Sequence, residues 1–210
     1  MGSPELRRQL AERGVEPGRI FVTGIPVRPE FKQTVRRRPA GPRHLLVMGG
    51  GLGMVPWSER FYKKLSALPE VRTTVLTGGN HRLLEHLSGR YKNVEAVGYT
   101  ERVFDYMAQA DLLLSKPGGI TVFESISAEL PMMLWNPALE QEKENARFLT
   151  EAGLARMAGP ADERCVTQVR DLIWDTAALE EMSRRMRRRK AQLEEESFVR
   201  LVSSLGQQVS

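Results

Sequence analysis

The chain has 210 residues, of which 41% are apolar, and this is enough to bury the core of one large α/β domain. Its single cysteine, Cys165, excludes an internal disulfide framework and favours a reducing compartment. The formal net charge of +5 is moderate, and no apolar run reaches the about 18 residues of a membrane-spanning helix, so we expect any membrane contact to be peripheral.

The predicted elements begin with residues 1–3, which read as an added leader, and a helix over residues 4–13. Further helices are expected over residues 121–129 and 162–174, and a long amphipathic helix over residues 176–205. Strands that alternate with helices indicate an α/β fold with a doubly wound, mostly parallel six-stranded sheet. The apolar or β-rich runs predicted as strands are residues 20–23, 44–48, 71–77, 94–97, 111–115 and 132–135.

Glycine-rich loops follow four of the predicted strands, at residues 49–53, 78–79, 98–100 and 117–121. Open parallel sheets bind ligands beyond the carboxyl ends of their strands, so we expect these loops to converge on one site. The first loop departs from the dinucleotide fingerprint, because Met54 stands where G-x-G-x-x-G requires its third glycine, and no P-loop string is present. The sequence therefore disfavours an NAD enzyme and a P-loop NTPase.

The glycine pair Gly118 and Gly119 separates a predicted strand from a helix, and such a junction presents backbone N–H groups. Those donors and the helix dipole favour a diphosphate at the start of the helix. Glu124, one turn further, is placed to accept hydrogen bonds from the ribose 2′- and 3′-hydroxyls. The alternative is an ordinary strand–turn–helix connection in which the glycines serve close packing.

Polar residues also gather at the predicted start of a helix near residue 141. Gln141 and Asn145 are four residues apart and share a helix face, with Glu142 beside Gln141, so their amide and carboxylate groups suit sugar hydroxyls. The alternative is a first helical turn that is simply rich in polar residues. None of the three histidines has the i, i+4 spacing of metal ligands and there is no Asp-x-Asp motif, so we expect no metal site.

The positive charge comes from six basic residues of the closing helix, since without them the total of +5 becomes −1. A basic patch suits anionic lipid or nucleic acid, but the acidic residues 194–196 that follow favour a solvated helix face. We therefore expect no nucleic-acid partner. The six residues are Arg184, Arg185, Arg187, Arg188, Arg189 and Lys190.

Five sequence segments, taken together in their order along the chain, resemble a known protein family. They are VTGIPVRPEF at residues 22–31, MGGGLG at 48–53, GYT at 98–100, SKPGGITVFE at 115–124 and NPALEQEKEN at 136–145. Together they resemble the donor-binding half of the GT-B glycosyltransferases of family 28, which contains MurG-type enzymes and diacylglycerol glycosyltransferases. The segments look closer to the glucosyl-diacylglycerol and monogalactosyldiacylglycerol synthases than to MurG, which would show a second glutamine where this chain has Glu142.

The resemblance implies a Rossmann-like GT-B C-terminal domain that binds UDP-glucose or UDP-galactose with no metal and no other cofactor. Arg28 would pair with the diphosphate, whereas alone it reads equally as a surface arginine. The Tyr99 ring would cover the uracil and the Thr100 backbone would read the edge of the base. The other implied donor contacts are Gly50, Gly51, Gly118, Gly119, Ile120, Thr121, Glu124, Gln141, Glu142 and Asn145.

The function implied by the resemblance is transfer of a hexose to diacylglycerol by a cytoplasmic enzyme that is peripheral on the inner face of the cell membrane. The general base would come from an N-terminal acceptor domain that we expect to be absent here, so no catalytic residue is assigned and the fragment alone is expected to be inactive. Residues 4–175 would form the donor domain and residues 176–210 a helical extension. The alternatives are a MurG-like transfer of N-acetylglucosamine to a lipid-linked peptidoglycan precursor, a UDP-sugar epimerase and a non-catalytic nucleotide-sugar sensor.

Overall fold

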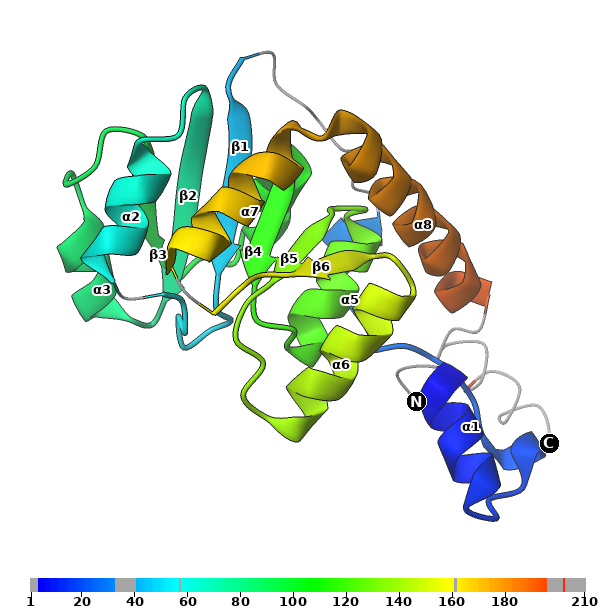
Figure 1. The fold of residues 1–210 in the computed structure, drawn as a ribbon. Coiled ribbons are helices and arrows are strands. Elements are labelled where there is room, and N and C mark those ends of the chain that lie inside the picture. The colour runs from blue at the N-terminus through cyan, green and yellow to red at the C-terminus, as the bar shows by residue number, and fades with distance from the viewer. Residues whose placement is uncertain (1–3, 33–40, 57, 161, 196–201, 203–210) are drawn as a thin grey trace.

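The protein is described by a computed structural model that covers residues 4–32, 41–56, 58–160, 162–195 and 202. Its centre is a six-stranded sheet in the order β3-β2-β1-β4-β5-β6, in which every neighbouring pair is parallel (Figure 1). The order reverses between β1 and β4, so the fold has the doubly wound α/β architecture that the sequence predicts. No helix in the described part of the chain has the length and apolar character needed to cross a membrane.

The elements alternate along the chain as expected for this architecture. The strands are β1 (Arg43–Met48), β2 (Val71–Gly78), β3 (Val94–Gly98), β4 (Leu112–Ser115), β5 (Met132–Leu134) and β6 (Ala155–Met157). The α-helices are α1 (Pro4–Glu12), α2 (Glu59–Ser66), α3 (His81–Leu87), α4 (Val103–Gln109), α5 (Gly119–Ser127), α6 (Glu140–Glu151), α7 (Asp162–Trp174) and α8 (Thr176–Glu195). Two short 3₁₀ helices, η1 (Pro17–Arg19) and η2 (Pro29–Lys32), lie in the N-terminal segment.

One predicted strand is absent from the structure, and one observed strand was not predicted. Residues 20–23 were expected to form a strand, but residues 20–28 belong to no helix or strand, although Ile20 and Val22 are buried. Alternate burial gives the same pattern as a strand, and it arises here without a backbone ladder. The sixth strand is instead β6, a three-residue edge strand with two exposed positions, which offers no apolar run to detect.

The ends of the chain lie partly outside the described residues. The expected leader at residues 1–3 and the predicted helical positions 196–201 and 203–205 belong to this part, including Val199 and Leu201 of the amphipathic pattern. The division of the chain at residue 176 stays a prediction.

Both faces of the sheet are covered by helices, so the core has two halves. Side chains alternate along β1: Leu45 and Val47 pack in one core cluster and Leu46 and Met48 in the other. The first cluster draws on α2, α3 and α7, and the second on α4, α5 and α6.

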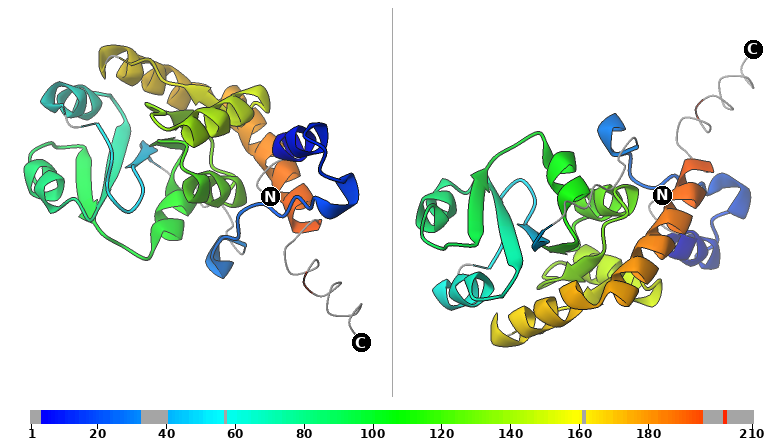
Figure 2. Two further views of the ribbon diagram at one scale, coloured as in Figure 1. Left: turned by 90° about the horizontal axis from the view of Figure 1, so that it is seen from below. Right: turned by 90° about the horizontal axis from the view of Figure 1, so that it is seen from above.

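Helix α8 contributes to both halves of this core. Leu179 and Met182 pack in the first cluster, whereas Met186, further along the helix, packs in the second and Leu193 lies against it. The two additional views in Figure 2 show α8 crossing the molecule from the end of α7 toward the N-terminal segment. At that end Leu193 and Phe123 enclose Gly24, where an added Cβ would lie 3.1 Å and 3.0 Å from them.

Candidate functional site

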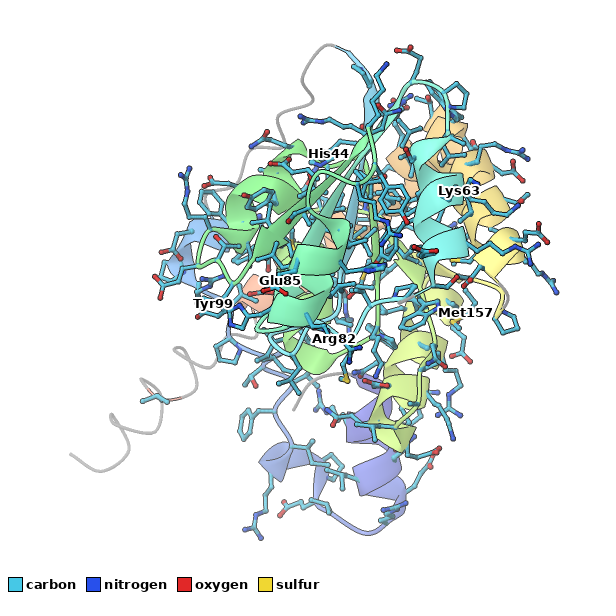
Figure 3. All side chains as sticks on the ribbon, turned by 90° about the vertical axis from the view of Figure 1, so that its left-hand side faces the viewer. His44, Lys63, Arg82, Glu85, Tyr99 and Met157 are labelled. Carbon is cyan, nitrogen blue, oxygen red and sulfur yellow. The ribbon has the colours of Figure 1, made fainter. Side chains whose placement is uncertain are left out.

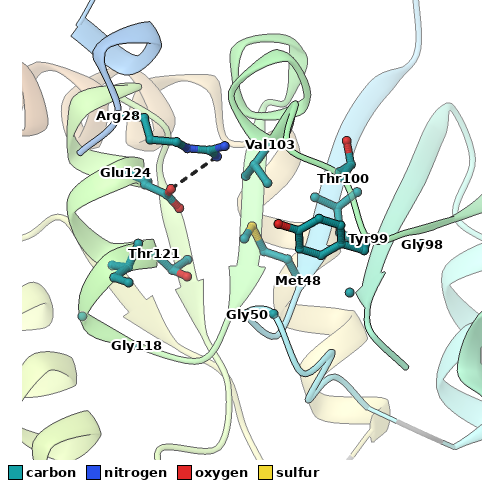
Figure 4. A pocket seen from close by; sticks show the side chains of 15 residues that line it. Arg28, Met48, Gly50, Gly98, Tyr99, Thr100, Val103, Gly118, Thr121 and Glu124 are labelled. Atoms are coloured by element: carbon teal, nitrogen blue, oxygen red, sulfur yellow. Dashed lines mark ion pairs between the residues drawn. The ribbon is translucent and has the colours of Figure 1, made fainter. Parts of the chain in front are cut away.

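A cavity of about 430 Å³ opens at the carboxyl edge of the sheet, where the strand order reverses between β1 and β4. Its walls come from the loops that follow β1, β2, β3 and β4 (Figure 4). Ten of the thirteen predicted site residues line it: Arg28, Gly50, Gly51, Tyr99, Thr100, Gly118, Gly119, Ile120, Thr121 and Glu124. The other three, Gln141, Glu142 and Asn145, are not among the lining residues.

Sequence reasoning missed the apolar part of the lining. Met48 and Leu76 lie in β1 and β2 near their carboxyl ends, and Val103 is the first residue of α4. Their positions at strand ends were the available signal, because a side chain near the carboxyl end of a central parallel strand lies next to the ligand edge.

The loop after β1 is shaped by backbone packing. A Cβ added at Gly53 would clash with the Thr77 carbonyl oxygen, and one at Gly78 would clash with the Gly51 carbonyl oxygen. By contrast, a Cβ at Gly50 or Gly51 would meet nothing within 4 Å. The loop after β1 therefore packs on one side against the end of β2, and on the other side it leaves Gly50 and Gly51 open to the cavity.

The start of α5 forms the opposite wall. Gly118 is the N-cap residue, and no side chain caps the helix start. The first N–H groups of an α-helix have no acceptor within the helix, so those of Gly119, Ile120 and Thr121 are suited to an anion. Most of the helix is buried, including Thr121 and Glu124, so this wall is fixed in the core.

Glu124 and Arg28 face each other across the cavity wall. Arg28 Nη2 lies 3.7 Å from Glu124 Oε1, as the dashed line in Figure 4 marks. Arg28 Nη1 also donates to the Glu101 carbonyl oxygen at 2.6 Å, and its guanidinium lies 5.6 Å from the centre of the Phe31 ring. Burial raises the pKa of Glu124, and the neighbouring Arg28 only partly opposes this rise.

The far end of the cavity is formed by the loop after β3. The Tyr99 side chain is 71% exposed, so its ring presents a flat apolar face to an incoming ligand. Thr100 Oγ1 accepts a hydrogen bond from the Arg102 N–H at 3.1 Å, which holds the turn that follows Tyr99.

The polar residues at the start of α6 lie beside the loop 115–119. Glu142 Oε1 pairs with Lys116 Nζ at 3.1 Å, and Glu142 Oε2 accepts from the N–H groups of Ala138 and Leu139. Burial alone would raise the pKa of Glu142, but these two N–H groups and Lys116 together hold it below its ordinary value. Asn145 Nδ2 donates to the Pro117 carbonyl oxygen at 2.9 Å.

None of the remaining perturbed titratable groups that the structure describes lines this cavity. His44 lies at the amino end of β1, the opposite end from Met48, and its place among the side chains is labelled in Figure 3. Burial and the charge of Arg72 lower the pKa of His44 to about 4. Within the described residues, no group of three or more His, Cys, Asp or Glu side chains is arranged to hold a metal ion.

Comparisons with known proteins agree with this geometry. The model of the Glycosyltransferase family 28 C-terminal domain matches residues 44–202. A processive diacylglycerol beta-glucosyltransferase of Bacillus subtilis (strain 168) is 29% identical over 197 residues, which cover 87% of this chain and 50% of that protein. The chain thus spans about half the length of the curated relatives it matches.

Solved structures share the fold at lower identity. The glycotransferase of kitacinnamycin superposes with a TM-score of 0.70 at 22% identity, over 93% of this chain and 51% of that one. MurG of Acinetobacter baumannii superposes with a TM-score of 0.59 at 21% identity, over 73% of this chain and 49% of that one.

Proposed function

Because this chain belongs to glycosyltransferase family 28, as the match over residues 44–202 shows, we propose that it is the donor-binding half of an enzyme that moves a hexose from a UDP-sugar to diacylglycerol. The observation that carries the donor assignment is the convergence of ten predicted contact residues on one cavity at the switch point of the sheet. The acceptor assignment is supported by the relatives, which are diacylglycerol glucosyltransferases.

The cavity suggests an orientation for the nucleotide. The exposed Tyr99 ring suits the uracil, Glu124 suits the ribose hydroxyls, and the N–H groups at the start of α5 suit the diphosphate. Arg28, which lines the same cavity, supplies a positive charge for the diphosphate. The sugar would then extend toward Gln141, whose side-chain nitrogen lies beside Gly119.

In this proposal the protein's own donors stabilise the departing UDP. Backbone N–H groups, the α5 dipole and Arg28 replace the cation that other glycosyltransferases use, so no metal is required. The acceptor and its general base belong to the half of the enzyme that lies outside the matched length of this chain. The whole enzyme would act at the inner face of the cell membrane, where diacylglycerol is found.

Calorimetric titration of this chain with three donors tests the proposal. UDP-glucose or UDP-galactose should bind more tightly than UDP-N-acetylglucosamine, and full-length protein incubated with diacylglycerol vesicles should produce the hexosyl lipid. Preferred binding and turnover of UDP-N-acetylglucosamine would instead support the MurG-like transfer. Binding with no glycosyl transfer by the full-length protein would support a sensor, and no UDP binding at all would refute the donor assignment.

A further inference from the structure

Lys116 and Glu142 form an ion pair inside the protein. Lys116 Nζ lies 3.1 Å from Glu142 Oε1, and only 11% and 10% of the two side chains are exposed. Lys116 belongs to the loop 115–119, which is counted here from the last residue of β4 to the first residue of α5, whereas Glu142 lies in the first turn of α6. Neither residue lines the cavity, although both segments lie next to it.

The second oxygen of Glu142 is bound within its own helix start. Glu142 Oε2 accepts from the N–H groups of Ala138, at 2.8 Å, and Leu139, at 3.2 Å. The bond to Leu139, the N-cap residue of α6, is the half of a capping box that a glutamate at this position makes. Both carboxylate oxygens therefore already accept from protein donors, and the mostly shielded ammonium of Lys116 is neutralised by the partner it has.

A further contact joins the same two segments. Asn145 Nδ2, one turn along α6, donates to the Pro117 carbonyl oxygen at 2.9 Å. Gln141 directly precedes Glu142 in sequence, and its Nε2 is 3.7 Å from the position of a Cβ built on Gly119. The first turns of α6 thus hold the loop 115–119 at two points and place the exposed Gln141 beside the start of α5.

We propose that the Lys116–Glu142 pair is a positioning device, which sets the loop 115–119 and the first N–H groups of α5 in register with Gln141 for donor binding. The proposal rests on the proposed function, because it concerns the same UDP-sugar. It changes the role predicted for Glu142 from a direct sugar contact to a positioning residue that acts through the loop. Gln141 then becomes the residue of this turn that reaches the sugar.

A double-mutant cycle distinguishes a pair that positions the loop from residues that contact the donor directly. Lys116→Met, Glu142→Gln and the double variant are titrated with UDP, UDP-glucose and uridine in a calorimeter, after circular dichroism has established that each is folded. The single carbonyl oxygen of a glutamine at position 142 can still accept the Ala138 and Leu139 N–H bonds, but its NH2 group then takes the place of the oxygen that faces Lys116. The change therefore removes the ion pair and keeps the bonds at the helix start. Each single variant should bind UDP about tenfold more weakly, and the double variant no more weakly than the worse single one.

UDP-glucose should lose at least the same factor as UDP, because the pair also sets the position of Gln141. Uridine should lose nothing, because it lacks the diphosphate that meets the loop. Lys116→Arg keeps the positive charge, so it should bind UDP much more tightly than Lys116→Met does and nearly as tightly as the original chain. Lys143 and Glu140 provide a matched control, since they lie 3.1 Å apart on the same helix but are 57% and 79% exposed. Lys143→Met and Glu140→Gln should leave all three affinities unchanged.

Several outcomes would overturn the proposal. A Glu142→Gln variant that keeps its UDP affinity and loses UDP-glucose affinity would make Glu142 a sugar ligand. Additive losses in the double variant would make Lys116 an independent phosphate ligand, and unchanged affinities throughout would leave the pair without a role in binding. If the charge variants do not fold, Asn145→Ala should show a milder form of the same signature, and its absence would count against positioning. Failure of the unaltered chain to bind UDP is a separate result, which refutes the proposed function itself.

Discussion

Arg28 and Glu124, which the proposed function assigns to different parts of one nucleotide, are each other's ion-pair partners in the structure, with 3.7 Å between Nη2 and Oε1. Glu124 is nearly buried and Arg28 is 42% exposed, so the arginine is the more accessible of the two partners to a ligand. A ligand that uses Glu124 for ribose must therefore compete with Arg28. A diphosphate offers the arginine a second anion, whereas a nucleoside without phosphate does not.

The first prediction follows from this competition. Arg28→Ala should weaken UDP about 10- to 100-fold, because a charge-assisted contact worth roughly 1.5–3 kcal/mol is lost. The same variant should bind uridine as well as the original chain or better, since Glu124 is released. Calorimetry with both ligands measures the two effects, and Arg102→Ala, which removes an 80% exposed arginine nearby, is the matched control. Equal losses for UDP and uridine would contradict the competition.

The second prediction concerns the ribose. Glu124→Gln should weaken UDP by about 1–3 kcal/mol, because an amide oxygen accepts hydroxyl hydrogen bonds less strongly than a carboxylate does. The disadvantage of 2′-deoxy-UDP relative to UDP, measured by the same titration, should shrink in this variant. Glu85→Gln, an exposed position on α3, should keep the wild-type preference. A folded Glu124→Gln variant with full UDP affinity would return Glu124 to a purely structural role.

The third prediction concerns metal ions. UDP should bind with unchanged affinity in EDTA, because the assigned diphosphate ligands are Arg28 and the N–H groups from Gly119 to Thr121. The titration is repeated after addition of magnesium as the matched condition. Loss of binding in EDTA with recovery in magnesium would show that the diphosphate is held through a cation.

The fourth prediction concerns the pH dependence of stability at the other end of the sheet. His44 is 3% exposed, its Nε2 lies 2.9 Å from Thr74 Oγ1, and its pKa falls from 6.5 to about 4 in the folded protein. Between pH 6.5 and 4, His44 is therefore protonated in the unfolded chain but neutral in the folded protein. The free energy of unfolding decreases as the pH falls through this range. This single group should remove about 3 kcal/mol over that window.

Urea unfolding at pH 7 and pH 4 measures this effect. The His44→Gln variant should lose less free energy of unfolding between the two pH values than the original chain, by about 3 kcal/mol. His81→Gln, at the exposed first position of α3, should keep the original pH dependence. Equal losses in all three proteins would show that His44 is protonated without cost in the fold.

Much of the cavity was predictable because its residues follow strands. Gly50, Tyr99 and Gly118 each lie within three residues of the end of a strand, and the carboxyl ends of parallel strands meet at one edge whatever the exact register. The sequence order of the motifs therefore translates into their spatial arrangement. The family match then confirmed the resemblance on which the roles depend.

The partners of individual side chains were not predictable in the same way. The sugar contact of Glu142 was predicted from the family resemblance, whereas its ion pair with Lys116 depends on how α6 packs against the loop 115–119. This packing brings together residues that are distant in sequence, so the local spacing of apolar and polar residues does not predict it. The strand error at residues 20–23 has another origin, because the alternating burial of Ile20 and Val22 gives the same pattern as a strand.

The path of α8 has a consequence for the order in which this domain is completed during synthesis. The chain emerges from the ribosome with α5 and the segment around Gly24 long before residues 176–195. Until then the second core cluster lacks Met186, and Phe123 and Gly24 lack the cover of Leu193. Because domains fold as units, the wall that carries Arg28 should reach its final position only after α8 has left the exit tunnel. The binding site would therefore be complete only some time after the strands of the sheet have been synthesised.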